Sequence, residues 1–311
     1  MAEYVIEPER RTLHGHFSRE LPPVLTINSG DTVRFRTLDA AWGIEPPNDT
    51  GEPRHKFEPR TQGLDDGHAL CGPIEIRGAK PGMTLAVRID EIVPGPYGWT
   101  VAGGWSNGIN ERLGVLNDQM MLRWTLDIEE MVGRNQFGQT VPLRPFMGVM
   151  GMPPDEPGVH PTAPPRVTGG NIDCKELVAG STLYLPIAVE GGLFSVGDGH
   201  ALQADGEVSS TAIECPMERV SLTFRLHEEM HIETPRAYTE AGWLTFGFDK
   251  NLDEATLFAL EEMLRLIEEK HGITRPMSLG LASLLVDMRI TQIVNGVRGV
   301  HAVLPHGAIQ G

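Results

Sequence analysis

Residues 79–92, AKPGMTLAVRIDEI, contain the pattern that decides the fold of this chain. Gly82 comes just before an alternation in which Leu85, Val87 and Ile89 fall on one side. Glycine permits a tight turn, and alternation of apolar with other residues is typical of a half-buried β-strand. The segment is therefore expected to be a strand that begins at a turn.

The same Gly-x-Thr-apolar pattern occurs twice more, at residues 27–38 (INSGDTVRFRTL) and 177–190 (LVAGSTLYLPIAVE). Three unevenly spaced copies are too few for a solenoid. Short strands separated by turns favour a β-sandwich or barrel instead. The first two thirds of the chain are therefore expected to form a β-rich core.

The last third changes character. Strands are expected at 219–228 and 242–248, and helices at 251–272 and from Ser278 to about Val286, with Asp253 as the N-cap and Gly272 as the stop of the first helix. Two more strands close the chain, at 288–296 and 297–305. The apolar stripe of the first helix consists of Leu257, Leu260, Met263, Leu264 and Ile267.

These patterns predict a β-rich α+β fold with a sandwich or barrel-like core. The expected division is residues 1–215 as the β-rich core and residues 216–311 as a smaller α+β segment packed on it. A soft boundary is placed near Pro216.

Composition excludes several classes of protein. The chain has 311 residues and a formal net charge of −16, and it contains no run of Lys or Arg, so a nucleic-acid partner is not expected. No apolar run approaches the roughly 18 residues of a membrane span. Cys71, Cys174 and Cys215 form no CxxC pair, and the first residues are charged, so a cytoplasmic protein without disulfides is expected.

The densest group of chemically active residues lies in residues 194–208, FSVGDGHALQADGEV. It places Asp198, His200, Asp205 and Glu207 within ten positions. Residues two apart on a strand face the same side, so each pair could reach one ion. Carboxylates combined with an imidazole suit zinc or another divalent metal ion.

A second segment, 168–177 (TGGNIDCKEL), offers Asn171 and Asp173 to the same site. A metal site requires these residues to converge in space with those of 194–208. The alternative is that both segments are solvated surface turns, in which Asp and Gly are common. Spacing alone leaves both interpretations open.

Other histidines have weaker patterns. His68 precedes a Gly-Pro turn and could be a ligand, a proton donor or a loop histidine; His14 and His16 flank a glycine. His227 and His231 give H-E-E-x-H, which resembles the helical zinc motif of metalloproteases. Because an alternating strand precedes them and Thr-Pro follows, a turn is expected there instead.

Residues 137–170 are rich in Pro and Gly and are expected to form an ordered loop. The part around residues 147–152, which includes Met150, and the side chains of Trp99 and Trp105 are expected to wall a small substrate pocket.

Several blocks of the sequence, in order, resemble successive blocks of the acetamidase/formamidase family over almost the whole chain. The long LFSVGDGHALQADGE block is the most specific of them. The blocks are residues 21–33 (LPPVLTINSGDTV), 71–85 (CGPIEIRGAKPGMTL), 145–154 (PFMGVMGMPP), 169–177 (GGNIDCKEL), 181–214 (STLYLPIAVEGGLFSVGDGHALQADGEVSSTAIE) and 287–305 (DMRITQIVNGVRGVHAVLP).

The resemblance implies a metal-dependent, homo-oligomeric amidohydrolase that releases ammonia and a carboxylate from short aliphatic amides such as formamide or acetamide. Carried over to this chain, it makes the residues of the GGN-x-D and GDGH blocks the leading metal-site residues. The next candidates come from the QADGE block and from the position before the Gly-Pro turn. In order, these residues are Asn171, Asp173, Asp198, His200, Asp205, Glu207 and His68.

Within this set, the working hypothesis assigns roles. Zinc is the expected ion, with Ca²⁺ or Mg²⁺ as an alternative for a second ion. Glu207 is the expected general base, helped by His68 and Asn171. The expected ligands are Asp173, Asp198, His200 and Asp205. Two alternatives remain open, namely hydrolysis of another small or cyclic amide, and a non-catalytic β protein that binds a metal or a small molecule.

Overall fold

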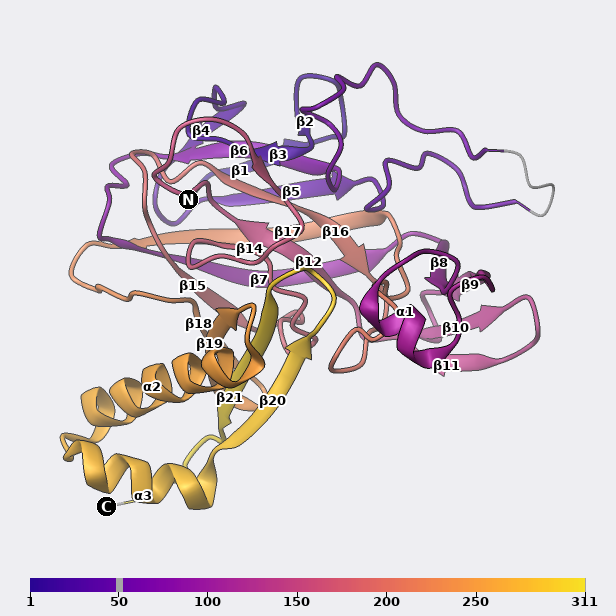
Figure 1. Ribbon diagram of the computed structural model, residues 1–311. Coiled ribbons are helices and arrows are strands. Elements are labelled where there is room, and N and C mark those ends of the chain that lie inside the picture. The colour runs from indigo at the N-terminus through magenta and orange to yellow at the C-terminus, as the bar shows by residue number, and fades with distance from the viewer. Residues whose placement is uncertain (49–52, 311) are drawn as a thin grey trace.

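The computed structural model describes residues 1–48 and 53–310, and its largest feature is a nine-stranded sheet (Figure 1). The three Gly-x-Thr segments form β5, β7 and β15 of this sheet, as predicted. Each strand follows a glycine with positive φ: Gly30 (96°), Gly82 (88°) and Gly180 (94°). In spatial order the strands are β1 (Glu3–Ile6), β5 (Thr32–Thr37), β17 (Met217–His227), β7 (Thr84–Pro94), β15 (Thr182–Pro186), β18 (Arg236–Thr239), β19 (Gly242–Asp249), β21 (Arg298–Leu304) and β20 (Asp287–Gln292).

A second, six-stranded sheet packs on the first. Phe194 of the second sheet and Phe224 of β17 meet edge to face, with ring centroids 5.1 Å apart, inside one continuous apolar core. The predicted β-rich α+β fold with a sandwich core is thus confirmed. The strands of the second sheet are β14 (Gly169–Asn171), β12 (Phe146–Gly151), β16 (Phe194–His200), β6 (Leu70–Ile76) and β2 (Leu13–His14), with β4 (Leu25–Ile27) also paired to β6.

Two helices, α2 (Leu252–His271) and α3 (Arg275–Leu285), lie at one end of the molecule, with α2 packed on β19 and β21 (Figure 1). Helix α2 ends at Gly272 in the left-handed conformation, as predicted. Its N-cap is Asn251, two residues before the expected Asp253. The side chain of Asn251 accepts a hydrogen bond from the backbone N–H of Asp253 at 2.9 Å.

The predicted apolar stripe of α2 was wrong at Leu257, which is 56% exposed. Ala255 and Ala259 occupy the buried face instead. The helix passes so close to β19 that a Cβ on Gly247 would lie 2.0 Å from the carbonyl oxygen of Ala255. Only small side chains fit at so short a helix–sheet distance.

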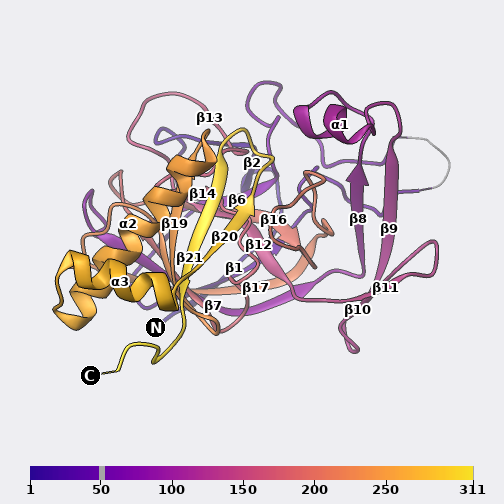
Figure 2. The same ribbon diagram turned by 60° about the horizontal axis from the view of Figure 1, so that its bottom comes forward.

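A four-stranded sheet and helix α1 (Gly108–Leu113) lie at the opposite end from α2 and α3, as both views show (Figures 1 and 2). The remaining pair of strands, β3 (His16–Phe17) and β13 (His160–Pro161), forms a small separate sheet. The strands of the four-stranded sheet are β11 (Thr140–Pro142), β10 (Val132–Asn135), β9 (Met120–Asp127) and β8 (Tyr97–Ala102).

The expected loop over residues 137–170 was wrong for part of its length, because residues 146–151 form β12. This strand lies between β14 and β16, and all six of its residues are buried. A strand covered on both faces shows no alternation of apolar and polar residues, which explains why it resembles a loop in a Gly-rich sequence. His227 ends β17 and His231 lies in the irregular segment before β18, so the expectation against a zinc helix there is confirmed.

Strands from both sides of the predicted boundary at residues 215/216 share the nine-stranded sheet, since β17 lies between β5 and β7. The division into 1–215 and 216–311 as separate units stays a prediction. The three cysteines are buried and unpaired. Among the described residues, no helix is both long and apolar enough to cross a bilayer.

Candidate metal centre

Five buried acidic and histidine side chains meet at one end of β16. Their possible ligand atoms form two groups, and within each group the atoms lie within 4.8 Å of one another. The first group is Asp173, Asp198 and His200; the second is His200, Glu207 and Glu214. His200 belongs to both groups and therefore lies at the centre of the cluster.

Different parts of the chain place these residues. Strand β16 supplies Asp198 and His200, and Asp173 follows β14. Glu207 lies in a turn that is held by the backbone N–H of Gly206, which donates to the carbonyl of Thr291 at 3.0 Å. The two segments singled out by their sequence therefore converge as the metal interpretation requires.

Glu214 reaches the cluster through irregular pairing. Its backbone forms isolated bridges with Trp99 and with His200. Its Oε1 accepts from the backbone N–H of Ala212 at 2.9 Å, and its Oε2 lies 3.4 Å from Nε2 of His200. Glu214 thus joins the site through a stretch that belongs to no named strand.

The cluster leaves many polar atoms without partners. Both ring nitrogens of His200 are buried and lack a hydrogen bond, although Nε2 lies 3.3 Å from Oδ1 of Asp198. Buried polar groups are nearly always satisfied, so such a concentration indicates a missing partner. The other unsatisfied atoms here are Asn171 Oδ1, Asp173 Oδ1, Glu207 Oε2 and Glu214 Oε2.

Gly148 of β12 faces the centre of the cluster. A Cβ at this position would lie 2.5 Å from Oδ2 of Asp198 and 2.7 Å from Oδ1 of Asp173, with Cε1 of His200 at 2.9 Å. A glycine here leaves room among the ligand atoms. Four carboxylates and one imidazole around this space fit a divalent cation.

The electrostatics agree with a cation site. Burial, reinforced by repulsion from neighbouring carboxylates, raises the pKa of Asp173 to about 7 and that of Glu214 to about 7. Burial and the charge of Asp173 raise the pKa of Glu207 well above its ordinary value. Asp198 differs: burial alone would raise its pKa, but His200 and His68 hold it below its usual range.

A cavity of about 670 Å³ opens onto the cluster. We call the floor of the cavity the part of its lining that also belongs to the cluster or carries its unsatisfied atoms. The floor consists of Asn171, Asp198, Glu207 and Glu214. Its lining also includes aromatic side chains and the loops around residues 56–68 and 159–163. The metal candidates are therefore open to a small molecule.

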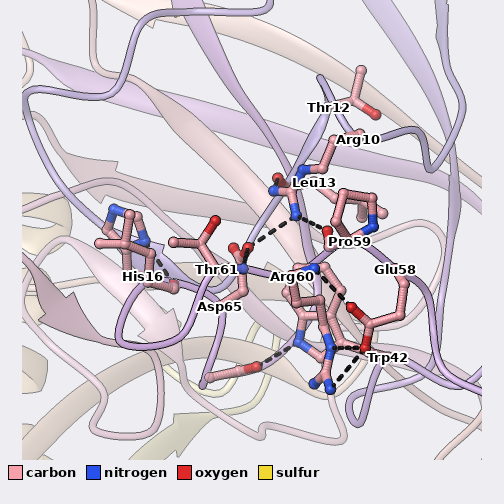
Figure 3. A network of polar contacts seen from close by, with 12 residues as sticks. Arg10, Thr12, Leu13, His16, Trp42, Glu58, Pro59, Arg60, Thr61 and Asp65 are labelled. Carbon is pink, nitrogen blue, oxygen red and sulfur yellow. Dashed lines mark hydrogen bonds and ion pairs between the residues drawn. The ribbon is translucent and has the colours of Figure 1, made fainter.

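One wall of the cavity is held by a polar network (Figure 3). Nη1 of Arg10 pairs with Oδ2 of Asp65 at 2.9 Å, and Oδ2 of Asp65 also accepts from the backbone N–H of Thr61 at 2.8 Å. The guanidinium groups of Arg10 and Arg60 each lie 5.9 Å from the ring of Trp42. These contacts fix the loop that carries Arg60 into the lining.

The structure brings together most of the residues predicted from the sequence. Asn171, Asp173, Asp198, His200 and Glu207 meet at the cluster or line its cavity.

Two of the predicted cavity-side residues, His68 and Trp99, line the cavity as well. Three predicted residues lie elsewhere. Asp205 lies outside both groups of possible metal ligands, and its Oδ2 forms an ion pair with Nζ of Lys175 at 2.7 Å. Met150 is buried in the core, and Trp105 lies in the loop before α1 and does not line the cavity.

Two site residues were missed in the sequence. Glu214 stands in an apolar run between Ile213 and Cys215, and a carboxylate in such a run is a usable signal of burial. Asn295 donates from Nδ2 to Oδ2 of Asp173 at 2.5 Å. Asn295 precedes a glycine, which is a turn pattern, so nothing local pointed to this long-range contact.

Comparison with known proteins gives a consistent family. A sequence model of the Acetamidase/Formamidase family matches residues 3–160 and 157–241. An acetamidase of Mycolicibacterium smegmatis is 25% identical over 253 residues, 63% of this chain and 61% of that protein. A formamidase of Methylophilus methylotrophus is 25% identical over 252 residues, 63% of this chain and 60% of that protein.

Among solved structures, an acetamidase from Bacillus halodurans superposes with a TM-score of 0.83 at 25% identity, covering 97% of each chain. The alignments to the two curated relatives span only about three fifths of their length, whereas this structural match spans nearly the whole of both chains.

Proposed function

The chain belongs to the acetamidase/formamidase family, and on this basis we propose that it hydrolyses a short aliphatic amide, of the formamide or acetamide type, to ammonia and a carboxylate. The observation that carries the proposal is the buried cluster at the floor of the cavity. It contains four carboxylates, and none of them pairs with a Lys or Arg among residues 1–48 and 53–310. Such a site suits a cation, and a cation at the floor of a cavity can act on a substrate.

We assign Asp173, Asp198, His200 and Glu214 as the residues that would hold a divalent ion. The imidazole favours Zn²⁺ over Ca²⁺ or Mg²⁺, which prefer oxygen ligands, although the surplus of carboxylates leaves room for either as a second ion. When bound, the ion would polarise the amide carbonyl and lower the pKa of a coordinated water from about 15.7 toward 7.

Glu207 is assigned as the general base. Its Oε2 is buried without a partner, and the residue lines the cavity. An unpartnered carboxylate in this place can take a proton from the attacking water and pass that proton to the departing nitrogen. General acid–base help of this kind is typically worth about 10²–10⁴-fold in rate. Asn171, also in the lining, can orient the amide.

Ammonia release from formamide and acetamide tests the proposal. The purified protein is assayed as isolated, after chelation, and after addition of Zn²⁺, Mg²⁺ or Ca²⁺ alone, with the metal content measured in parallel. We expect activity to be lost with the chelator and restored by one of these ions. An active sample that contains no divalent metal would refute the metal assignment.

Substitutions separate the ligands from the base. Glu214→Gln and His200→Ala are expected to lower metal content and activity together. Glu207→Gln should keep the metal and lower kcat by about 10²-fold or more. Asp205→Asn, outside both ligand groups, is the matched control and should keep both. Loss of metal in Glu207→Gln would make Glu207 a ligand instead.

The size of the cavity favours a second candidate, hydrolysis of a larger or cyclic amide. A volume of about 670 Å³ falls in the range that holds drug-sized ligands and far exceeds the size of formamide. A panel of amides of increasing size, ranked by kcat/KM, decides between the two.

A further inference from the structure

His68 and Thr162 lie on separate loops, 94 residues apart in sequence, and meet at the wall of the cavity. The backbone N–H of His68 donates to Oγ1 of Thr162 at 2.9 Å. The ring Nδ1 of His68 lies 2.7 Å from the same oxygen. One hydroxyl therefore holds both the main chain and the ring of His68.

Counting hydrogens decides which ring nitrogen carries the proton. Thr162 is 1% exposed, and among the described residues its hydroxyl forms hydrogen bonds only with these two nitrogens of His68. If Nδ1 carried the proton, Oγ1 would accept two N–H groups and its own hydrogen would have no acceptor. If the hydroxyl donates to Nδ1, its own hydrogen, Nδ1 and the backbone N–H of His68 all have partners. In a neutral ring the proton then lies on Nε2.

The contact is built into the packing of the loops. A Cβ on Gly67 would lie 2.4 Å from Oγ1 of Thr162 and 2.4 Å from the carbonyl oxygen of Gly15. Nε1 of Trp42 donates to the carbonyl of Gly67 at 2.8 Å. The backbone before His68 is thus pressed against Thr162 and held there from the other side.

Nε2 of His68 makes no hydrogen bond with any residue in the described ranges, and His68 lines the same cavity as Asp198 and Glu207. We propose that Thr162 is a positioning residue that keeps His68 in its Nε2–H form, and that His68 donates this hydrogen bond to the carbonyl oxygen of the bound amide as negative charge develops on it. The proposal rests on the proposed amidase function and deepens it. The proton stays on Nε2, so no bond to His68 is made or broken.

This geometry makes His68 a hydrogen-bond donor and not a general base or a metal ligand. A general base or a metal ligand needs a free lone pair, but the lone pair of Nδ1 is occupied by Thr162 and Nε2 carries a proton. Proton transfer is left to Glu207. Hydrogen-bond donors to a developing oxyanion are typically worth about 10²–10³-fold in kcat.

Four variants test the assignment with the holoenzyme and its best amide. Thr162→Val removes the hydroxyl at nearly constant shape, and Thr162→Ser keeps it. We expect kcat to fall about 10–100-fold in Thr162→Val with a smaller change in KM, and to stay near wild type in Thr162→Ser. His68→Gln should lose about 10²–10³-fold in kcat. The double variant His68→Gln/Thr162→Val should be no worse than His68→Gln, because Thr162 acts through His68.

Two further readouts keep the test decisive. Metal content should stay at the wild-type level in all four variants, and ¹⁵N NMR of histidine-labelled protein should show the His68 signal, identified by its absence in His68→Gln, with the proton on Nε2. A proton on Nδ1, metal loss in His68→Gln, or an additive loss in the double variant would overturn the proposal. A wild-type protein without amide hydrolysis would instead refute the proposed function, and the NMR result would still report on the tautomer.

Discussion

Three of the five cluster residues have backbone conformations that L-amino acids adopt rarely. Asp173, Asp198 and Glu207 have φ values of 54°, 59° and 45°. The left-handed region is unfavourable for residues with a Cβ, although Asp tolerates it better than most. Such residues persist where the surrounding structure fixes them, and they concentrate at functional sites. The chain therefore gives up some stability to aim these carboxylates at one point.

The space in front of Gly148 leads to the first prediction. In Gly148→Ala the new methyl group would overlap the carboxylate oxygens of Asp198 and Asp173. We expect bound metal to fall below one tenth of the wild-type level, with a stability loss of about 1–3 kcal/mol from overpacking. Metal analysis and urea unfolding measure the two effects. Gly280→Ala is the control, because a Cβ on Gly280 would meet nothing within 4 Å. A wild-type metal content in Gly148→Ala would contradict the cluster as the metal site.

His14 leads to a prediction about pH. Its Nδ1–H donates to the carbonyl of His16 at 2.7 Å, and its Nε2 lies 2.9 Å from Oγ of Ser195. Burial lowers the pKa of His14 from 6.5 to about 4. A folded-state pKa below the unfolded one means that this contribution to stability is complete above pH 6.5 and is lost as the pH falls toward 4. The shift corresponds to about 3 kcal/mol.

The measurement is urea unfolding of metal-free wild type and His14→Gln between pH 7.5 and pH 4. The difference in free energy of unfolding between the two should shrink by up to about 3 kcal/mol over this range. His271→Gln, at the exposed end of α2, serves as the control. A difference that stays constant with pH would show that His14 is not responsible.

At the residue scale, four of the five members of the cluster could be named as candidates from the sequence. Asp198 and His200 were predicted because they are two apart on a strand, and that local rule holds in β16. Asp205 and Glu207 follow the same spacing, but they lie in a turn, where the rule does not apply, and Asp205 pairs with Lys175 instead. Glu214 was missed because isolated bridges, which have no periodic pattern, bring it in.

At the scale of elements, the turn between β20 and β21 supports the site from the far end of the sequence. Asn295 in this turn holds Asp173, and β20 holds the turn of Glu207 through Gly206. Partners that orient metal ligands typically contribute 10–100-fold to metal affinity. We therefore expect Asn295→Ala to weaken metal binding about 10–100-fold without unfolding the protein.

Competition with a chromophoric chelator measures this affinity, and circular dichroism checks the fold. Asn295→Asp is a second variant, because it brings a carboxylate against Asp173 and should weaken binding at least as much. Unchanged affinity in both variants would mean that Asp173 needs no orientation by Asn295 or is not a ligand.

The elements that could be predicted are those with local rules. The strands after Gly30, Gly82 and Gly180 show turn chemistry and alternation together, and Gly272 marks the end of α2. Strand β12 lacks alternation because both of its faces are buried. The order of strands in the main sheet, with β17 between β5 and β7, depends on long-range packing that no local pattern encodes.

At the scale of the whole molecule, the nine-stranded sheet ends at β20. The outer edge of β20 contacts Gly206 only at the C-terminal end of the strand, at Gln292. Residues 287–290 therefore remain at the edge of the sheet. Met288 and Ile290 are 38% and 41% exposed there, and neighbouring α3 exposes Met277 and Leu284. Exposed edge strands with apolar side chains are sites where sheets pair, and an antiparallel edge can pair with a second copy of itself about a two-fold axis.

We therefore expect the chain to form homo-oligomers through this edge. Light scattering after size exclusion should show a multiple of the 34.1 kDa chain mass, and Ile290→Lys should shift the protein toward the monomer. Leu113→Lys, at the exposed end of α1 on the opposite side of the molecule, is the control and should leave the mass unchanged. A monomeric wild type would contradict the assembly altogether. Dissociation by Leu113→Lys but not by Ile290→Lys would place the assembly surface elsewhere. Because the cluster and its cavity are built within one chain, the Ile290→Lys monomer should keep its metal.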